Sequence, residues 1–179
     1  MREDMLGLLK SRRSIRKYKP EQISDAELKA VLEAATFAPT GKGAQSPIII
    51  AVQNKEDCDR LRRMNAALLG ISGDPYHGAP TIVLVLADKS VRPTFVEDGS
   101  CVLAYIMLAA EALGLGTCWV NREREMFESE EGKALLKKWG VASGDFVGVG
   151  ACSLGYPEGE ARPPIPRKPD YVRIVKSRK

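Results

Sequence analysis

The sequence predicts a single α+β domain over residues 1–179, with helices covering a central sheet. Segments with helical and strand patterns are mixed along the chain, without the regular strand–helix–strand alternation of a parallel sheet. One long segment, residues 95–113, is apolar on most sides, which is typical of a helix in the middle of a protein. Hydrophobic residues make up 44% of the 179 positions, enough for a sizeable core.

Local signals mark the elements of the first half of the chain. Residues 1–10 are predicted to form a short opening helix. Ser24 and Glu27 have the spacing of a capping box and start a second helix, which Pro39 and the glycines after it end. Short β-branched runs indicate buried strands, and apolar residues at helical spacing indicate a third helix. We therefore expect strands at 48–52 and 81–87, a helix at 55–69 and a loop at 70–80.

The second half continues with the helix at 95–113, a strand at 117–120, an amphipathic helix at 129–139 and a strand at 146–154. Five of the 11 prolines then fall within residues 156–170, which excludes helix and disfavours strand. Residues 156–179 are therefore predicted to form an extended arm, with an edge strand at 171–175. Because such arms commonly reach another subunit, we expect a homodimer. The alternative is an arm packed on its own domain.

Composition excludes several classes of protein. The net charge of +4 is mild, and a chain with 6% aromatic residues is poorly suited to stacking on nucleic-acid bases. No apolar run approaches the roughly 20 residues that cross a bilayer, and the first ten residues lack a signal-peptide core. We expect a cytoplasmic protein without a membrane span. His77 is the only histidine, and the cysteines show no ligand spacing, so no metal site is expected.

The residues from Arg12 to Arg16 form the first candidate site. Arg12, Arg13, Ser14 and Arg16 place three guanidinium groups and a hydroxyl within five residues. Guanidinium groups are planar and permanently charged, and they grip phosphate through paired hydrogen bonds. This segment is a candidate phosphate clamp. The alternative is a basic surface loop.

Three further segments combine glycine with polar or aromatic residues. Residues 38–45 form a glycine-rich turn between a helix and a strand, in which backbone N–H groups can approach a ligand, but a plain connecting turn has the same pattern. Residues 114–121 include Trp119, which is either a core residue or the wall of a cofactor site. Residues 155–157, followed by Arg167 and Lys168, return positive charge after the last strand.

Familiar catalytic motifs are missing from the sequence. Gly148-Val149-Gly150 lacks the third glycine and the following helix of a dinucleotide fingerprint, and the turn at 38–45 lacks the P-loop pattern. A nucleophile elbow and an HExxH motif are also absent. No side chain is therefore assigned as a catalytic residue, and we expect a cofactor to supply the chemistry.

Taken in order, these segments resemble the nitroreductase family of FMN-dependent oxidoreductases, and the match runs from Arg12 to Val175. The resemblance rests on RRSIR, APTGKGAQ, EDGS before a helix of small residues, LGLGTCW, LGYP and PRKP. It implies a homodimer with a mixed or antiparallel sheet, an FMN site at the subunit interface, and a C-terminal arm added to the partner subunit.

The resemblance also assigns residues to FMN. The phosphate and ribityl chain would be held by Arg12, Ser14, Arg16, Arg167 and Lys168, with Arg13 as a neighbour near the N1/O2 edge of the flavin. The partner subunit would supply Pro39, Thr40, Gly41 and Gln45. Asn65, together with the segment of Trp119, Asn121 and Arg122, would lie near the ring. Many members carry an asparagine where this chain has Gly43, which puts one flavin contact in doubt.

The implied activity is two-electron transfer from NADH or NADPH, through FMN, to a nitroaromatic, quinone or similar small acceptor by a ping-pong mechanism. Two alternatives remain open at this point. One is another flavin-dependent dehydrogenase or dehalogenase on the same fold, and the other is a non-enzymatic flavin-binding protein.

Overall fold

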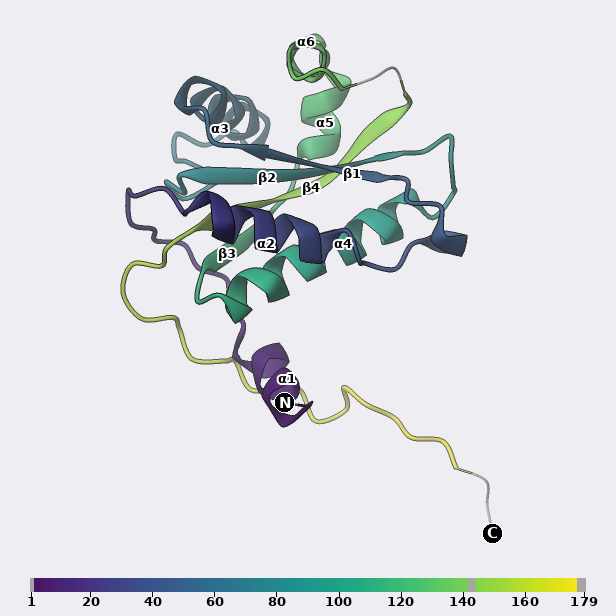
Figure 1. Cartoon of the computed structure of the whole chain (residues 1–179). Helices are drawn as coiled ribbons and strands as arrows, with labels where there is room; N and C mark the ends of the chain where they lie inside the picture. The colour runs from purple at the N-terminus through teal and green to yellow at the C-terminus, as the bar shows by residue number, and fades with distance from the viewer. Residues whose placement is uncertain (1, 142–143, 177–179) are drawn as a thin grey trace.

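The computed structural model describes residues 2–141 and 144–176 and confirms the α+β fold. Its four-stranded sheet has the order β1-β2-β4-β3, and every pair of neighbouring strands is antiparallel. The strands are β1 (Pro47–Val52), β2 (Thr81–Asp88), β3 (Gly116–Val120) and β4 (Phe146–Gly155). Figure 1 shows the sheet as the middle layer between two layers of helices.

The helices divide between the two faces of the sheet. One face carries α2 (Asp25–Ala35) and α4 (Phe95–Ala112), and the other carries α3 (Lys55–Leu69), α5 (Glu123–Glu128) and α6 (Glu130–Lys138) (Figure 1). The strand β2 is buried on both faces. Val83 and Val85 join the core beneath α2 and α4, whereas Leu84 and Leu86 join the core beneath α3, α5 and α6. Successive side chains of β2 point to opposite faces of the sheet, so this one strand contributes to both cores.

Local signals place the ends of several helices as predicted. The Ser24 backbone N–H donates to Glu27 Oε2 at 2.9 Å, and the Glu27 N–H donates to Ser24 Oγ at 3.2 Å, which completes the capping box at the start of α2. Gly140 follows α6 with a φ of 70°, a left-handed conformation that ends a helix readily when the residue is glycine.

Two sequence predictions are wrong. Residues 48–52 were expected to form a buried strand, but β1 lies at the edge of the sheet and only Val52 is buried within this chain. The helix α5 was not predicted, because the next helix after the strand at 117–120 was expected only at residue 129. Its six residues are too few to show a helical period, and its buried face includes an acidic residue, Glu123.

The termini extend away from the sheet. The helix α1 (Arg2–Ser11) and the segment after β4 leave the body on the same side (Figure 1). Tyr156 is half-buried against the body, Pro157 makes an isolated bridge to Tyr18, and residues 158–176 of the arm are exposed. Residues 171–175 form no strand within this chain, so the predicted strand addition to a partner stays a prediction. Residues 177–179 of the predicted arm, like Met1 of the opening helix, lie outside the described residues.

Within residues 2–141 and 144–176, no helix is both long enough and apolar enough to cross a membrane.

Candidate functional site

A cleft of about 580 Å³ lies where β3 ends, beside the loop that follows α3. Its walls combine one arginine from the N-terminal segment with apolar side chains and with the residues that follow β3. The lining residues are Arg16, Leu69, Ile71, Asp74, Pro75, His77, Cys118, Trp119, Val120, Asn121 and Arg122. A mainly apolar wall with a few convergent polar groups is the usual composition of a cofactor site.

Backbone pairing with β3 places the arginine segment at this cleft. The Ile15 N–H donates to the Thr117 carbonyl at 2.8 Å, and Ser14 and Thr117 form a parallel bridge. A side chain at Gly116 would collide with Ile15, so glycine lets the two segments approach closely. This pairing fixes the direction in which Arg16 leaves the backbone.

The three arginines of this segment have different surroundings. Arg13 Nη1 donates to the carbonyls of Lys10 (2.7 Å) and Arg12 (2.8 Å), so part of its guanidinium caps the end of α1. Arg12 Nη1 is buried without a hydrogen-bond partner in the described chain. A buried guanidinium N–H without a partner is costly, and a bound anion would satisfy it. Arg16 is exposed at the cleft.

The residues after β3 form a constrained turn at the cleft. Trp119 Nε1 donates to Asn121 Oδ1 at 2.8 Å, which fixes the asparagine side chain. Arg122 has a φ of 92°, a left-handed conformation that disfavours residues other than glycine. Asn65 is fully buried beneath this turn, and its Nδ2 donates to the Asn121 carbonyl at 2.8 Å. Such strained backbone is concentrated at functional sites in proteins.

The loop after α3 supplies the opposite wall and is held by one carboxylate. Asp74 accepts hydrogen bonds from the N–H groups of Tyr76 (2.8 Å) and Gly78 (2.6 Å), and it pairs with Arg62 at 3.0 Å. His77 lies between them with a φ of 60° and lines the cleft. Burial, followed by the charge of Arg16, lowers the pKa of His77. The imidazole is therefore mainly neutral at neutral pH.

The turn at residues 38–45 lies elsewhere, between α2 and β1. The Gly41 N–H donates to Asp98 Oδ1 at 2.8 Å, and Gln45 N–H donates to Thr40 Oγ1 at 3.1 Å. A side chain at position 41 would collide with Thr94, which explains the glycine. Lys42 and Gln45 both have positive φ, so the turn is strongly constrained. Pro39 and Gln45 are the exposed members of this turn that the sequence predicted as site residues.

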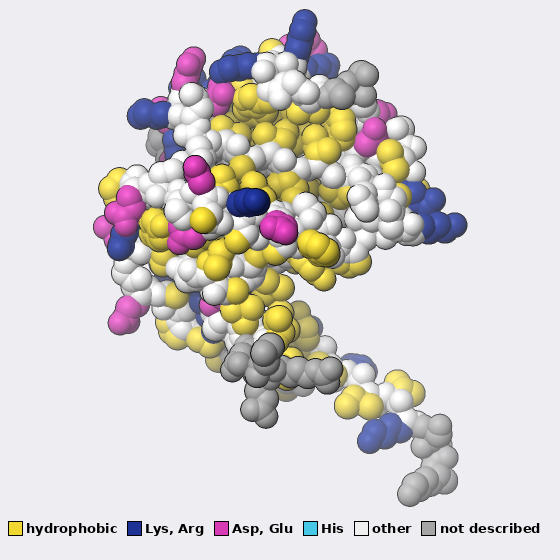
Figure 2. Space-filling view, viewed as in Figure 1, with side chains coloured by type: hydrophobic (Ala, Val, Ile, Leu, Met, Phe, Trp, Pro, Cys, Tyr) yellow, Lys and Arg dark blue, Asp and Glu magenta, His cyan; other side chains and the backbone are white. Residues whose placement is uncertain are grey.

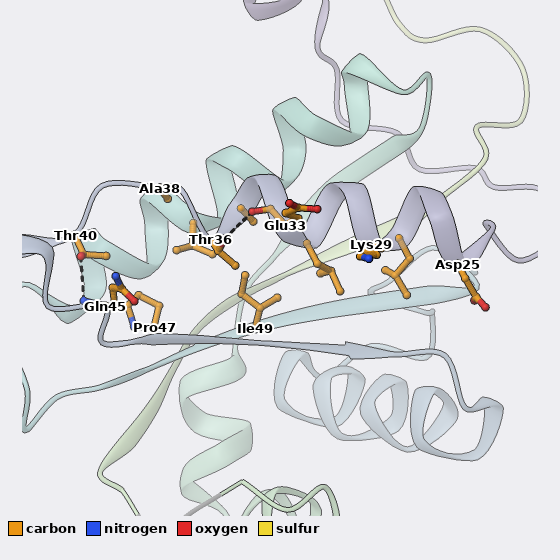
Figure 3. Close-up of a pocket in the computed structure, with 13 residues that line it drawn as sticks. Asp25, Lys29, Glu33, Thr36, Ala38, Thr40, Gln45, Pro47 and Ile49 are labelled. Carbon is orange, nitrogen blue, oxygen red and sulfur yellow. Dashed lines mark hydrogen bonds between the residues drawn. The ribbon is translucent and has the colours of Figure 1, made fainter.

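A groove of about 790 Å³ adjoins this turn (Figure 3). It runs along α2 and the free edge of β1, and Figure 3 shows Pro47 and Ile49 of β1 beneath α2 and Thr36, the residue that follows α2. Phe37, which follows α2, is 75% exposed. Phe37 does not line the groove but lies next to it in the chain, so an unpaired strand edge and an exposed aromatic side chain occur in the same region, as is common where another chain binds.

One chain therefore assembles part of the predicted site. Arg16, Trp119, Asn121 and Arg122 line the β3 cleft, with Asn65 beneath it. Pro39, Thr40, Gly41 and Gln45 belong to the separate turn, and Arg167 and Lys168 lie on the exposed arm. Sequence reasoning missed His77 as a residue of the cleft. Its position in a Gly/Pro loop directly after a helix was the available signal, but no spacing pattern linked it to Arg16.

Comparison with known proteins agrees with this architecture. The sequence profile described as the nitroreductase family matches residues 9–156 of this chain. The chain belongs to the nitroreductase family.

Individual relatives match almost the whole chain. A protein of Archaeoglobus fulgidus, provisionally named NADH dehydrogenase/NAD(P)H nitroreductase, is 33% identical over 165 residues, which are 88% of this chain and 88% of the relative. A nitroreductase of Bacteroides fragilis, solved with bound FMN, superposes with a TM-score of 0.87 at 28% identity and covers 97% of this chain and 99% of its own. One from Desulfitobacterium hafniense, also solved with FMN, gives a TM-score of 0.87 at 25% identity, with coverages of 97% and 98%.

Proposed function

We propose that this protein binds FMN in the β3 cleft and uses NADH or NADPH to transfer two electrons to a small acceptor, such as a nitroaromatic or a quinone. The observation that carries the proposal is the meeting of Arg16 with the apolar and constrained residues after β3 in one cleft. Membership of the nitroreductase family and the FMN bound in two related structures support it.

The residues present fit FMN at both ends of that molecule. An FMN phosphate carries about two negative charges. The unpartnered Arg12 Nη1, the Ser14 hydroxyl and the exposed Arg16 guanidinium would hold it. Leu69, Ile71 and Trp119 offer apolar surface for a flat ring.

FMN, when bound, would supply the hydride and electron chemistry, and the residues of the chain would orient the reactants. The constrained turn at Asn121 and Arg122 would hold backbone groups at a fixed position against the ring. Arg13, already anchored to α1, would place positive charge near the ring or ribityl chain. No side chain is required as a nucleophile or as an obligatory acid, and nicotinamide and acceptor would occupy the same place in turn, which gives ping-pong kinetics.

A homodimer would complete this site. The apolar residues of the arm are strongly exposed in a single chain: Tyr171 is 70% and Val175 is 95% exposed. We propose that the arm of one chain lies along the free edge of β1 and the α2 groove of its partner, with Arg167 and Lys168 brought to the partner's phosphate site. The turn of Pro39, Thr40, Gly41 and Gln45 would approach the flavin bound mainly by the other chain.

The absorption spectrum of the purified protein, followed by anaerobic addition of NADH or NADPH, tests the function. We expect a released chromophore identified as FMN, loss of its absorption on addition of reduced nicotinamide, and recovery when a nitroaromatic or quinone is added. Parallel double-reciprocal plots would support the ping-pong order. FMN that stays oxidised with both nicotinamides would indicate a flavin carrier, and a protein unable to bind FMN would overturn the proposal.

A further inference from the structure

A buried polar cluster lies directly behind the turn that follows β3. Tyr76 and Glu123 are 0% and 1% exposed, and the Tyr76 hydroxyl donates to Glu123 Oε1 at 2.9 Å. Asn65 Nδ2 donates to the Tyr76 hydroxyl at 3.3 Å. Glu123 Oε2 and Asn65 Oδ1 have no hydrogen-bond partner in the described chain. A carboxyl group in such a place is costly when it is ionised and much less so when it is protonated.

This cluster is linked to the cleft by both the backbone and a side chain. Glu123 is the first residue of α5 and follows Arg122, the residue with a φ of 92°. Asn65, which contacts Tyr76, also donates to the Asn121 carbonyl at 2.8 Å. From the other side, β4 presses on the same residue, because a side chain at Gly148 would collide with the Glu123 backbone. A change at the Glu123 carboxyl can therefore move Arg122 through the backbone and Asn121 through Tyr76 and Asn65.

No positive charge of the described chain is paired with Glu123. The titratable groups acting on it or next to it are Tyr76, Glu125 on its own helix, and Cys152 on β4, while α3 contributes the neutral Asn65. Asp74 lies behind Tyr76 and is paired with Arg62.

The charged side chains of α6 are engaged elsewhere or exposed. Lys133 pairs with Glu130, Lys138 with Asp57, and Glu131 with Arg60, and Lys137 is exposed. Burial is the largest influence and raises the pKa of Glu123 to about 7.

We propose that Glu123 is a proton-sensitive positioning residue: acting through Tyr76 and Asn65, its ionisation shifts the Asn121–Arg122 turn and weakens cofactor binding. The inference rests on the proposed FMN site. The ionised carboxylate would require a second hydrogen-bond donor and would place a negative charge behind a cleft that binds an anion. The protonated carboxyl leaves the turn as the structure shows it. Above neutral pH, FMN should therefore bind more weakly than it would if residue 123 stayed uncharged.

The substitution Glu123→Gln separates ionisation from hydrogen bonding, since the amide oxygen can still accept from Tyr76. FMN dissociation constants would be measured by quenching of flavin fluorescence from about pH 5.5 to about pH 8.5 for the parent and the variant. Their ratio at each pH cancels titration of the FMN phosphate and of the other residues of the cleft. Glu128→Gln is the matched control, because Glu128 lies at the exposed end of the same helix.

We expect the parent-to-variant ratio of dissociation constants to be near one at the acidic end and to rise about fivefold or more at the basic end, which is the size of a typical coupling between sites. The Glu128→Gln ratio should stay flat. A flat ratio for Glu123→Gln, with FMN bound by both proteins, overturns this inference and leaves the proposed function standing. Failure of the parent to bind FMN at any pH overturns both.

Tyr76→Phe provides an independent readout. Removal of the hydroxyl takes the donor from Glu123 and an acceptor from Asn65, so the turn loses its support. The visible circular dichroism of bound FMN should change in Tyr76→Phe and, above neutral pH, in the parent relative to Glu123→Gln. A spectrum that is identical in all three proteins at every pH would contradict a positioning role.

Discussion

At the residue scale, Arg16 is the clearest test of phosphate binding, because it is the arginine of the N-terminal segment that lines the cleft. A charge-assisted hydrogen bond contributes about 1.5–3 kcal/mol. Arg16→Ala should therefore weaken FMN binding by roughly 10- to 100-fold, as measured by fluorescence quenching.

Lys19→Ala is the matched control, since Lys19 is an exposed residue of the same segment that pairs loosely with Glu21 at 3.8 Å. It removes the same charge, so it should leave the affinity almost unchanged. Equal weakening by the two substitutions would indicate general electrostatic attraction rather than a phosphate contact by Arg16.

The buried Glu123 should also make the free energy of unfolding depend on pH in the protein without cofactor. Because the pKa of Glu123 is about 7 in the folded chain, against an ordinary value of 4.5, the folded state holds this proton more tightly than the unfolded state does. This contribution is fully present below about pH 4.5 and is lost as the pH rises to about 7. The free energy of unfolding should fall by up to about 3 kcal/mol over that range.

The neutral Glu123→Gln variant should lack this loss. Urea unfolding at about pH 5 and about pH 8 measures it, and the advantage of the variant over the parent should be larger at the higher pH. An equal difference at the two pH values would mean that the Glu123 carboxyl has an ordinary pKa in the folded protein.

At the scale of helices and strands, the fold depends on close contact between β4 and α5. A Cβ at Gly148 would collide with the backbone of Glu123 and Arg124, so Gly148→Ala should push α5 and the turn before it away from the sheet. Overpacking of this kind costs about 1–3 kcal/mol. We expect that loss in urea unfolding, together with weaker FMN binding.

Gly7→Ala is the control for this substitution. Gly7 lies in α1 with open space around its Cα, so alanine there should be neutral or stabilising by up to about 1 kcal/mol. Equal effects at positions 7 and 148 would contradict the proposed packing of α5.

The elements that could be predicted from sequence are those whose signals are local. The capping box at Ser24, the helical period of α3 and α4, and the β-branched runs of β1 and β2 depend on neighbouring residues. The short helix α5 depends instead on contact with β4. The burial of Glu123 was equally hidden, because a glutamate in a polar segment is normally exposed.

The candidate site shows the same division. The arginine segment, the glycine-rich turn at 38–45 and the segment at 114–121 were singled out from residue types and spacing, whereas Asn65 and Arg122 were assigned to the flavin by the family resemblance. Their distribution over two separate places in one chain was implied by the family resemblance, since no local pattern shows which residues come from a partner. His77 is placed in the cleft, and the Tyr76–Glu123 pair is placed behind it, by tertiary contacts alone.

At the level of the whole molecule, the exposed arm and the free edge of β1 support the proposed homodimer. Figure 2 shows hydrophobic side chains exposed where α1 and the arm leave the body. Met5, Leu6 and Leu9 of α1 are all exposed in the single chain. A contiguous exposed apolar surface of this kind favours association. Truncation after Arg162 should therefore yield monomers in light scattering and abolish FMN retention. A truncated chain that remains a dimer with FMN would exclude the arm from both roles.

In the proposed homodimer, two chains together hold two FMN molecules. Native mass spectrometry of the purified protein, after incubation with excess FMN and removal of the free flavin, measures this directly. We predict one dominant species that contains two chains and two FMN molecules. Single chains that each retain FMN, or dimers that retain none, would contradict an FMN site shared between two chains.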